Sequence, residues 1–412
     1  MGNFIQDYKD YASEATDSPP IYHEFAALAT LAAAAGNRLY LQRGHLTLRP
    51  NLYIVLIGKS SKFRKSTSLF VSRDLVRNTQ KDLVMPDDFS IEAIIEMMSK
   101  SPSGILYYPE FLGLMKKAKR DYTSGLKSFL TEIYDCPETV TRALKAGKKK
   151  TEEGQPKVDI VTINNPCISI LAASTQKWFI EELSEDDFHG GFIPRFCLVP
   201  ARKDELLPES VDPTPRSPQK RQTLLDRLTW VNSTAGEMTL EDREHFRTLY
   251  LNFSARFEQQ DEDIFEPYIE RLKTTAIKFA MLRQLGEEVP SKTISRQAME
   301  YGFGLATEVA TRIAMVRKTL VFSPYERTSQ KILDYLASGP KKQSEIYRMA
   351  RMSDRELLPI LGGMLKSETI VEKRERANGG RPALVYSLPE RNTSYPLLAT
   401  SYTGGSGKKS AF

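Results

Sequence analysis

The chain has few cysteines, few histidines and no long apolar run, and each shortage excludes a class of protein. Cys136, Cys167 and Cys197 are too few and too scattered along 412 residues for a disulfide framework. The four histidines show no metal-ligand spacing. The longest nearly apolar stretch, residues 25–35, is short of the ~20 residues that a membrane-spanning helix requires. These shortages predict a cytoplasmic protein without a zinc site and without contact with a membrane.

Positive charge is only slightly in excess, but it is unevenly distributed. With 58 Lys and Arg against 52 Asp and Glu, the formal net charge is +6. Residues 147–150 read G-K-K-K, and a second basic cluster lies between residues 373 and 381. Local basic patches are what binding to a phosphate backbone requires, although solvated loop charges are the simpler explanation for either cluster alone.

Three short apolar runs predict strands that are covered on both faces. They span residues 51–57, 104–108 and 167–173, and helical patterns at 90–100 and 111–120 separate them. Alternation of such strands with helices indicates an α/β fold in which helices sandwich a parallel sheet.

The remaining pattern predicts four parts. Residues 1–203 form the α/β core with an N-terminal helical segment, and a Pro-rich stretch opens an all-helical subdomain at 204–325. A small separate module covers 326–389, and a Gly- and Ser-containing tail at 390–412 is expected to be disordered.

The first apolar run leads into a loop of the kind that binds phosphate. The sequence G-K-S-S-K-F-R-K-S-T follows residue 57, and a helical segment comes next. In a P-loop the backbone N–H groups surround the phosphates, which assigns charge neutralisation to Lys65 and the Mg²⁺ ligand to Ser66. The lysine stands seven positions after Gly58 instead of six, so strict spacing would select Arg64 as the cation. The alternative interpretation of this segment is a basic turn before an amphipathic helix that binds no phosphate.

Three further landmarks follow in order. The second run ends in Tyr-Pro-Glu, which places Glu110 where a carboxylate could activate water. The third run ends at Ser174 and Thr175, either of which could contact a γ-phosphate. A Gly-Gly turn then precedes Arg195.

In this order the landmarks resemble those of AAA+ P-loop ATPases, specifically the minichromosome-maintenance-like replicative helicases. They are also similar to a family of uncharacterised bacterial and phage ATPases that are often joined to primases, which shares the Arg-Lys-Ser-Thr departure. The resemblance covers roughly residues 20–310 and implies a AAA+ core with an all-α lid, binding ATP and Mg²⁺ between subunits of a hexameric ring.

The resemblance also implies roles for individual residues. Glu110 and Ser174 would be catalytic, together with Arg195 from the neighbouring subunit, and Ser66 would bind Mg²⁺. The residues assigned to the nucleotide are Gly58, Ser60, Arg64, Lys65, Ser66, Thr67 and, at the start of a lid helix, Arg271. Pro109 departs from the family pattern. It stands where the family has an Asp that holds a Mg²⁺-bound water, and a proline side chain accepts no hydrogen bond.

A lysine-rich hairpin is expected between the second and third strands. Strand-like arms at 139–142 and 159–163 flank Lys148, Lys149 and Lys150. The resemblance implies that such lysines grip a DNA backbone inside the ring. The alternative is a disordered surface loop.

The C-terminal module predicts a winged helix-turn-helix. Three helical segments, the last opened by a capping box at residues 353–356, precede two strands with a basic tip. The residues expected to contact DNA are Arg355, Lys373, Arg374, Arg376 and Arg381. Many such modules bind only protein.

The sequence therefore favours an ATP-dependent DNA helicase or translocase that replicates a phage, plasmid or other mobile element, with a primase as a possible partner. Its setting would be a bacterial or phage-infected host cytoplasm. A nucleotide-gated replication initiator without unwinding activity is the second hypothesis, favoured by Pro109. A winged-helix transcription regulator with a vestigial ATPase domain is the third.

Overall fold

The computed structural model describes residues 2–59, 62–118, 125–150, 156–176, 179, 187, 190–208, 215–257, 266–317, 324–375 and 383–389. The chain forms two compact units, Met1–Leu320 and Val321–Phe412. Among the described residues, no helix has both the length and the apolar character needed to cross a bilayer.

A parallel sheet forms the centre of the first unit. Its strands are β3 (Tyr53–Ile57), β4 (Ser103–Tyr108), β7 (Cys167–Ser174) and β8 (Phe196–Pro200). They lie in the order β4-β7-β3-β8, and each neighbouring pair is parallel. Every residue of β3, β4 and β7 is buried, as expected for strands with helices on both sides. The predicted α/β class with a parallel sheet is therefore confirmed.

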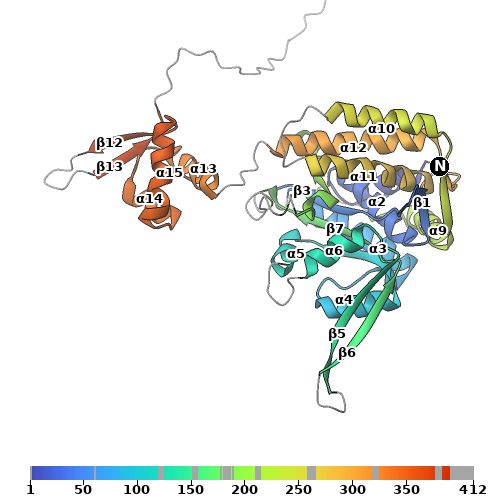
Figure 1. The fold of residues 1–412 in the computed structure, drawn as a ribbon. Coiled ribbons are helices and arrows are strands. Elements are labelled where there is room, and N and C mark those ends of the chain that lie inside the picture. The colour runs from blue at the N-terminus through green and yellow to red at the C-terminus, as the bar shows by residue number, and fades with distance from the viewer. Residues whose placement is uncertain are drawn as a thin grey trace, which may run out of the picture. The chain divides into compact units, whose positions relative to one another are not determined.

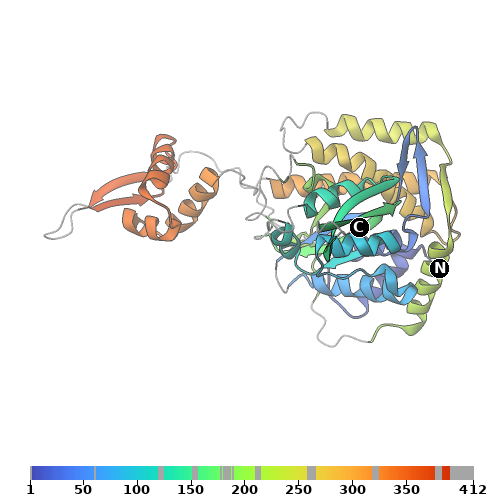
Figure 2. The same cartoon turned by 60° about the horizontal axis from the view of Figure 1, so that its bottom comes forward.

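Helices cover both faces of this sheet (Figures 1 and 2). The helices are α2 (Pro20–Ala35) and α3 (Lys65–Thr79) on one face, and α5 (Phe111–Ala118) and α6 (Leu126–Tyr134) on the other. Successive side chains of a strand point to opposite faces. The Tyr107 hydroxyl lies 2.9 Å from Ser72 Oγ of α3. The hydroxyl of Tyr53, which belongs to the alternate row, donates to the Leu130 carbonyl of α6 at 3.0 Å.

The strand register defines two edges of the sheet. At the carboxyl edge Ile57 pairs with Ser174 on one side and with Pro200 on the other. At the amino edge Tyr53 pairs with Phe196. Five strand residues separate these edges by about 15 Å. Ligands of open parallel sheets bind outside the carboxyl ends of the strands, so a ligand site is expected at the carboxyl edge.

The segment expected to be all helical also contains two strands. Its helices are α9 (Pro218–Ser233), α10 (Arg243–Phe257), α11 (Glu266–Leu285) and α12 (Arg296–Arg317). A second sheet has the order β10-β9-β1-β2. Its strands are β10 (Thr293–Ile294), β9 (Gly236–Leu240), β1 (Leu39–Arg43) and β2 (Leu46–Leu48). This sheet joins the segment to the N-terminal region, which also holds α1 (Phe4–Ser13). The all-helical prediction for this segment was wrong, because strands of two to five residues carry too little pattern to be recognised.

A long antiparallel ribbon extends from the first unit (Figure 1). It consists of β5 (Thr139–Lys150) and β6 (Pro156–Asn164), and α4 (Ile91–Lys100) packs against β6. At its base Val140 and Ile163 are buried, whereas Ile160 is 75% exposed. The ribbon is therefore anchored at its base and exposed farther out, and it contains both predicted arms.

The second unit has three helices followed by a hairpin. The helices are α13 (Pro324–Leu336), α14 (Gln343–Ala350) and α15 (Asp354–Lys366). A three-stranded sheet has the order β11-β13-β12, from β11 (Lys341–Lys342), β13 (Ala383–Ser387) and β12 (Val371–Glu375). The Glu356 carboxylate accepts hydrogen bonds from the backbone N–H and the hydroxyl of Ser353, which confirms the predicted capping box. Ile332, Ile346 and Leu357 are buried in the unit's own core.

Candidate functional site

The loop after β3 begins at a glycine that the packing requires. A Cβ atom on Gly58 would lie 2.5 Å from the Tyr22 hydroxyl oxygen and 3.0 Å from the Phe63 ring. The Tyr22 hydroxyl donates to the carbonyl of Ile57 at 2.7 Å, so it is fixed in place. A larger residue at position 58 would therefore displace the first turn of the loop.

Lys65 folds back into this loop. Its ammonium donates to the carbonyls of Gly58 and Lys59, both at 2.9 Å, and the residue is only 9% exposed. Desolvation lowers the pKa of this ammonium below its usual value. An anion brought into the loop would stabilise the charge that burial disfavours.

Arg64 has a different position and a different partner. Its side chain forms an ion pair with Asp17 at 3.1 Å, and it is 44% exposed. Its φ of +45° lies in the left-handed region, which glycine adopts most easily. The strict phosphate-loop pattern has glycine at this position. Of the two cations that the spacing left open, the geometry favours Lys65 as the one that faces a loop-bound anion.

The first turn of α3 has the properties of an anion site. It contains no acidic residue, and the Arg64 side chain does not cap it. Ser66 is exposed and Thr67 is half-buried. The N–H groups of Thr67 and Ser68 donate to the Arg64 carbonyl at 3.0 and 3.4 Å. The positive end of the helix dipole favours negative charge at such a position. Ser60, the remaining predicted loop residue, lies outside the described residues.

The two predicted catalytic residues of the neighbouring strands lie at the same edge as the loop. The Gly58 N–H donates to the Ser174 carbonyl at 3.2 Å, which places Ser174 beside the start of the loop. Tyr108, the last residue of β4, is level with Ala172, so Glu110 follows at about the level of Ser174. The sheet thus brings Lys65, Ser174 and Glu110 to one edge.

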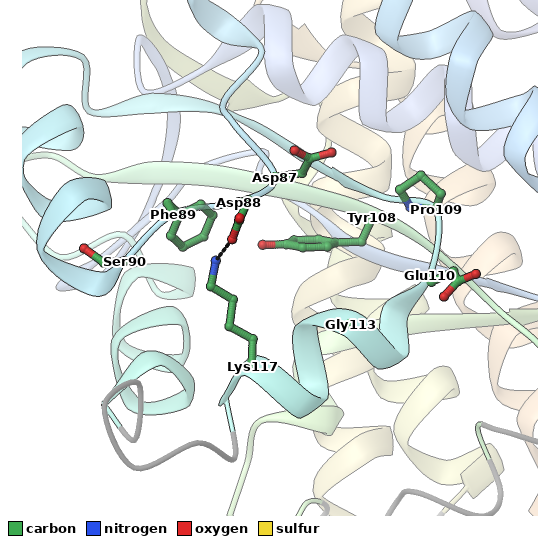
Figure 3. A pocket seen from close by; sticks show the side chains of 9 residues that line it. All are labelled: Asp87, Asp88, Phe89, Ser90, Tyr108, Pro109, Glu110, Gly113 and Lys117. Carbon is green, nitrogen blue, oxygen red and sulfur yellow. Dashed lines mark hydrogen bonds and ion pairs between the residues drawn. The ribbon is translucent and has the colours of Figure 1, made fainter.

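Glu110 stands at the border of an open hollow of about 710 Å³ (Figure 3). The hollow is lined by Asp87, Asp88, Phe89, Ser90, Tyr108, Pro109, Glu110, Gly113 and Lys117. Lys117 binds Asp88 at 2.9 Å and lies 4.3 Å from the centre of the Phe89 ring. Both Glu110 and Pro109 are exposed, so solvent reaches the carboxylate.

Arg195 and Arg271 meet at the other edge of the sheet. Arg195 precedes β8 and donates to Asp135 Oδ2 at 2.7 Å, while Arg271 of α11 donates to Asp135 Oδ1 at 2.8 Å. Arg195 is 8% exposed, and its Nη1 also donates to the carbonyl of Gly191 at 2.5 Å. Gly191 has a φ of +72°, and a Cβ there would lie 2.9 Å from Arg195 Nη1, so glycine is needed in this turn.

This arrangement separates Arg271 from the loop of its own chain. Within one chain Arg271 lies with Arg195 at the amino edge, because both arginines donate to Asp135, and its assignment to a nucleotide stays a prediction. The helical segment instead brings Arg312 of α12 to the carboxyl edge, where it donates to the Pro200 carbonyl and to Glu205, both at 2.9 Å. Arg312 was not among the predicted site residues, because its only signal in the sequence is a Glu308–Arg312 pair spaced by four residues.

The predicted DNA contacts fall on both units. Lys148, Lys149 and Lys150 are the last residues of β5. In the second unit Arg355 is exposed on α15, and Lys373 and Arg374 are exposed on β12. Arg376 and Arg381 lie outside the described residues.

The sequence matches no model of a known protein family and no curated protein sequence.

Proposed function

We propose that the chain is an ATP-dependent DNA translocase or helicase of the AAA+ type. The observation that carries this proposal is the position of four residues at the carboxyl edge of one parallel sheet. Lys65 and Ser66 open α3, Ser174 is the last residue of β7, and Glu110 follows β4.

The residues at this edge fit a magnesium–nucleoside triphosphate. MgATP would supply the phosphoryl group that is cleaved and the cation that offsets its charge. The loop N–H groups and Lys65 would hold the phosphates, the Ser66 hydroxyl would bind Mg²⁺, and Glu110 would orient water. Magnesium in such sites is held largely by phosphate and water, so a cluster of three acidic ligands is not required.

Arg195 and Arg271 are proposed to act on a nucleotide bound by a second copy of the chain. Within one chain they are separated from the loop by the length of a strand, about 15 Å. Because one carboxylate holds both, they would move together toward developing phosphoryl charge. This sharing requires head-to-tail association of copies, and a hexameric ring is the assembly that the family resemblance implies.

DNA would be held by the β5–β6 ribbon and by the C-terminal unit as a winged helix. The role in replication of a phage, plasmid or mobile element, with a primase as a possible partner, follows from the family resemblance alone. The DNA contacts are proposed through phosphates, which lysines bind without reading sequence.

The decisive experiment is DNA-stimulated ATP hydrolysis by the full chain. Lys65→Ala should reduce kcat/KM by at least about 100-fold, because a buried charge that faces the phosphates is lost. Glu110→Gln should retain ATP binding and lose hydrolysis. Lys62→Ala, which removes an exposed lysine of the same loop, serves as the matched control. Equal activity of the Lys65→Ala and Lys62→Ala variants would disprove the nucleotide site.

A second candidate function is a nucleotide-gated DNA-binding initiator. Pro109 favours it, since no carboxylate directly precedes Glu110 to hold a magnesium-bound water. A forked DNA duplex distinguishes the two candidates. Strand displacement with ATP supports the motor, and ATP-dependent binding without displacement supports the initiator.

A further inference from the structure

A second open hollow, of about 510 Å³, lies away from the nucleotide site and is lined by four cations. Arg73 and Arg77 belong to α3, Lys81 to the short helix η1 (Lys81–Leu83), and Lys100 to the end of α4. None of the four forms an ion pair with another described residue, and Asp82 is the single carboxylate in the lining. The lining therefore carries a net charge of +3 (four cations and one anion).

Helix-dipole compensation explains only part of this cluster. Arg77 and Lys100 lie in the last turns of α3 and α4, where a cation stabilises the helix end. The helix dipole does not explain why two further cations line the same hollow. These are Arg73, which lies one turn before Arg77, and Lys81. Four like charges around one space repel each other, and an anion within the space would relieve the repulsion.

Apart from Ser101, the rest of the lining is apolar. It consists of Val84, Met85, Pro86 and Met97, of which Met85 is buried. A ligand that suits both parts has negative charges at intervals and flat apolar faces between them. Single-stranded nucleic acid has both, whereas a duplex presents phosphate and sugar and keeps its base faces stacked inside.

The hollow opens beside the base of the β5–β6 ribbon. Ser101 belongs to its lining, and the carbonyl of the next residue, Pro102, accepts a hydrogen bond of 2.8 Å from the Cys167 N–H. Cys167 begins β7 directly after the ribbon ends at Asn164, and α4 packs against β6. Basic groove and ribbon thus form adjoining surfaces of one unit.

We propose that this groove binds the phosphate backbone of single-stranded DNA and continues the path of a strand held by the ribbon. The identity of the polyanion as DNA rests on the proposed function. The groove itself rests on its apolar residues and on four cations that form no ion pair within the described part of the chain.

The test is the salt dependence of binding of a fluorescent oligothymidine by the full chain. Arg77→Ala/Lys81→Ala/Lys100→Ala should lower the slope of log K against log salt by about 2, since each single-strand phosphate contact contributes about 0.7. Affinity near 0.1 M salt should fall at least tenfold. The matched control is Arg243→Ala/Arg247→Ala/Lys292→Ala, which removes the same charge from exposed positions on α10 and before β10.

Each outcome decides the proposal. Loss of slope in the groove variant alone supports it, and equal loss in both variants overturns it, because only net charge would then matter. A lower melting temperature with unchanged DNA binding also overturns it and assigns the cations to helix stability. Tighter binding of a duplex overturns the single-strand assignment. A groove effect in a protein that hydrolyses no ATP would sustain the groove and refute the proposed motor.

Discussion

Arg64 shows how one residue can depart from a motif and preserve its backbone geometry. Its left-handed φ of +45° is the conformation that glycine adopts most easily, and glycine is the residue that the strict phosphate-loop pattern has at this position. For a residue with a side chain this conformation costs about 1–2 kcal/mol. The ion pair with Asp17 offsets part of that cost.

Arg64→Gly is therefore expected to be tolerated. The substitution relieves backbone strain and removes an exposed ion pair worth at most about 1 kcal/mol, so the free energy of unfolding should change by less than about 1 kcal/mol. ATP affinity should stay within about threefold of wild type because Lys65 keeps its place. Urea unfolding and nucleotide titration measure the two effects. Arg64→Ala, which keeps the strain and loses the ion pair, should be the less stable variant, and the reverse order would contradict this explanation.

At the scale of elements, the sequence predicts what is long and strongly patterned. The runs at 51–57, 104–108 and 167–173 are β3, β4 and β7, because strands buried on both faces must be almost wholly apolar. The β9–β10 pairing could not be predicted, since its partners are short and distant in sequence. The position of Arg271 also depends on how α11 crosses the sheet, which no local pattern encodes.

The β5–β6 ribbon allows a prediction of its own. Lys148→Ala/Lys149→Ala/Lys150→Ala should lower the salt slope of single-strand binding by about 2 and leave DNA-independent ATP hydrolysis within about twofold of wild type. Fluorescence anisotropy across a salt series measures the slope. The triple variant on α10 and before β10 described above is again the charge-matched control. An unchanged slope would mean that the ribbon does not contact DNA.

At the scale of the whole molecule, shared sites between subunits are open to a mixing experiment. Lys65→Ala keeps intact arginines, and Arg195→Ala keeps an intact loop, so each protein alone should be inactive. In a mixed ring, some interfaces combine the intact loop of an Arg195→Ala subunit with the intact arginines of a Lys65→Ala subunit. In an equal mixture about one interface in four is of this kind, so up to about a quarter of wild-type ATP hydrolysis should return. Lys65→Ala mixed with Lys65→Ala/Arg195→Ala offers no complete interface and is the control. No recovery in the first mixture would place Arg195 outside the neighbour's site.

The pH dependence of global stability has an identifiable source in α2. His23 is fully buried, and neither ring nitrogen has a hydrogen-bond partner among the described residues. Burial, followed by the charges of Arg216 and Lys9, lowers its pKa to about 4. The unfolded chain takes up this proton near pH 6.5 and the folded chain resists it, so stability falls as pH drops from 6.5 toward 4. The loss between pH 7 and 5 is about 2 kcal/mol.

His23→Leu should remove that part of the pH dependence. Urea unfolding at pH 7 and pH 5 measures it, and the difference between the two values should shrink by about 2 kcal/mol. His45→Leu, at an exposed position, should leave the difference unchanged. A difference that persists in His23→Leu would assign the acid sensitivity to other groups.

The carboxylate between Arg195 and Arg271 has a consequence for how such a ring would be built. A newly made chain supplies one carboxylate to the two arginines, so their charge is only half compensated before any partner arrives. In the proposed ring, association would bring the neighbour's phosphate to a pair of arginines that still carries a net charge of +1. Asp135 would then hold both arginines in place in a subunit that has no neighbour, and would release them when a nucleotide-bound neighbour joins it.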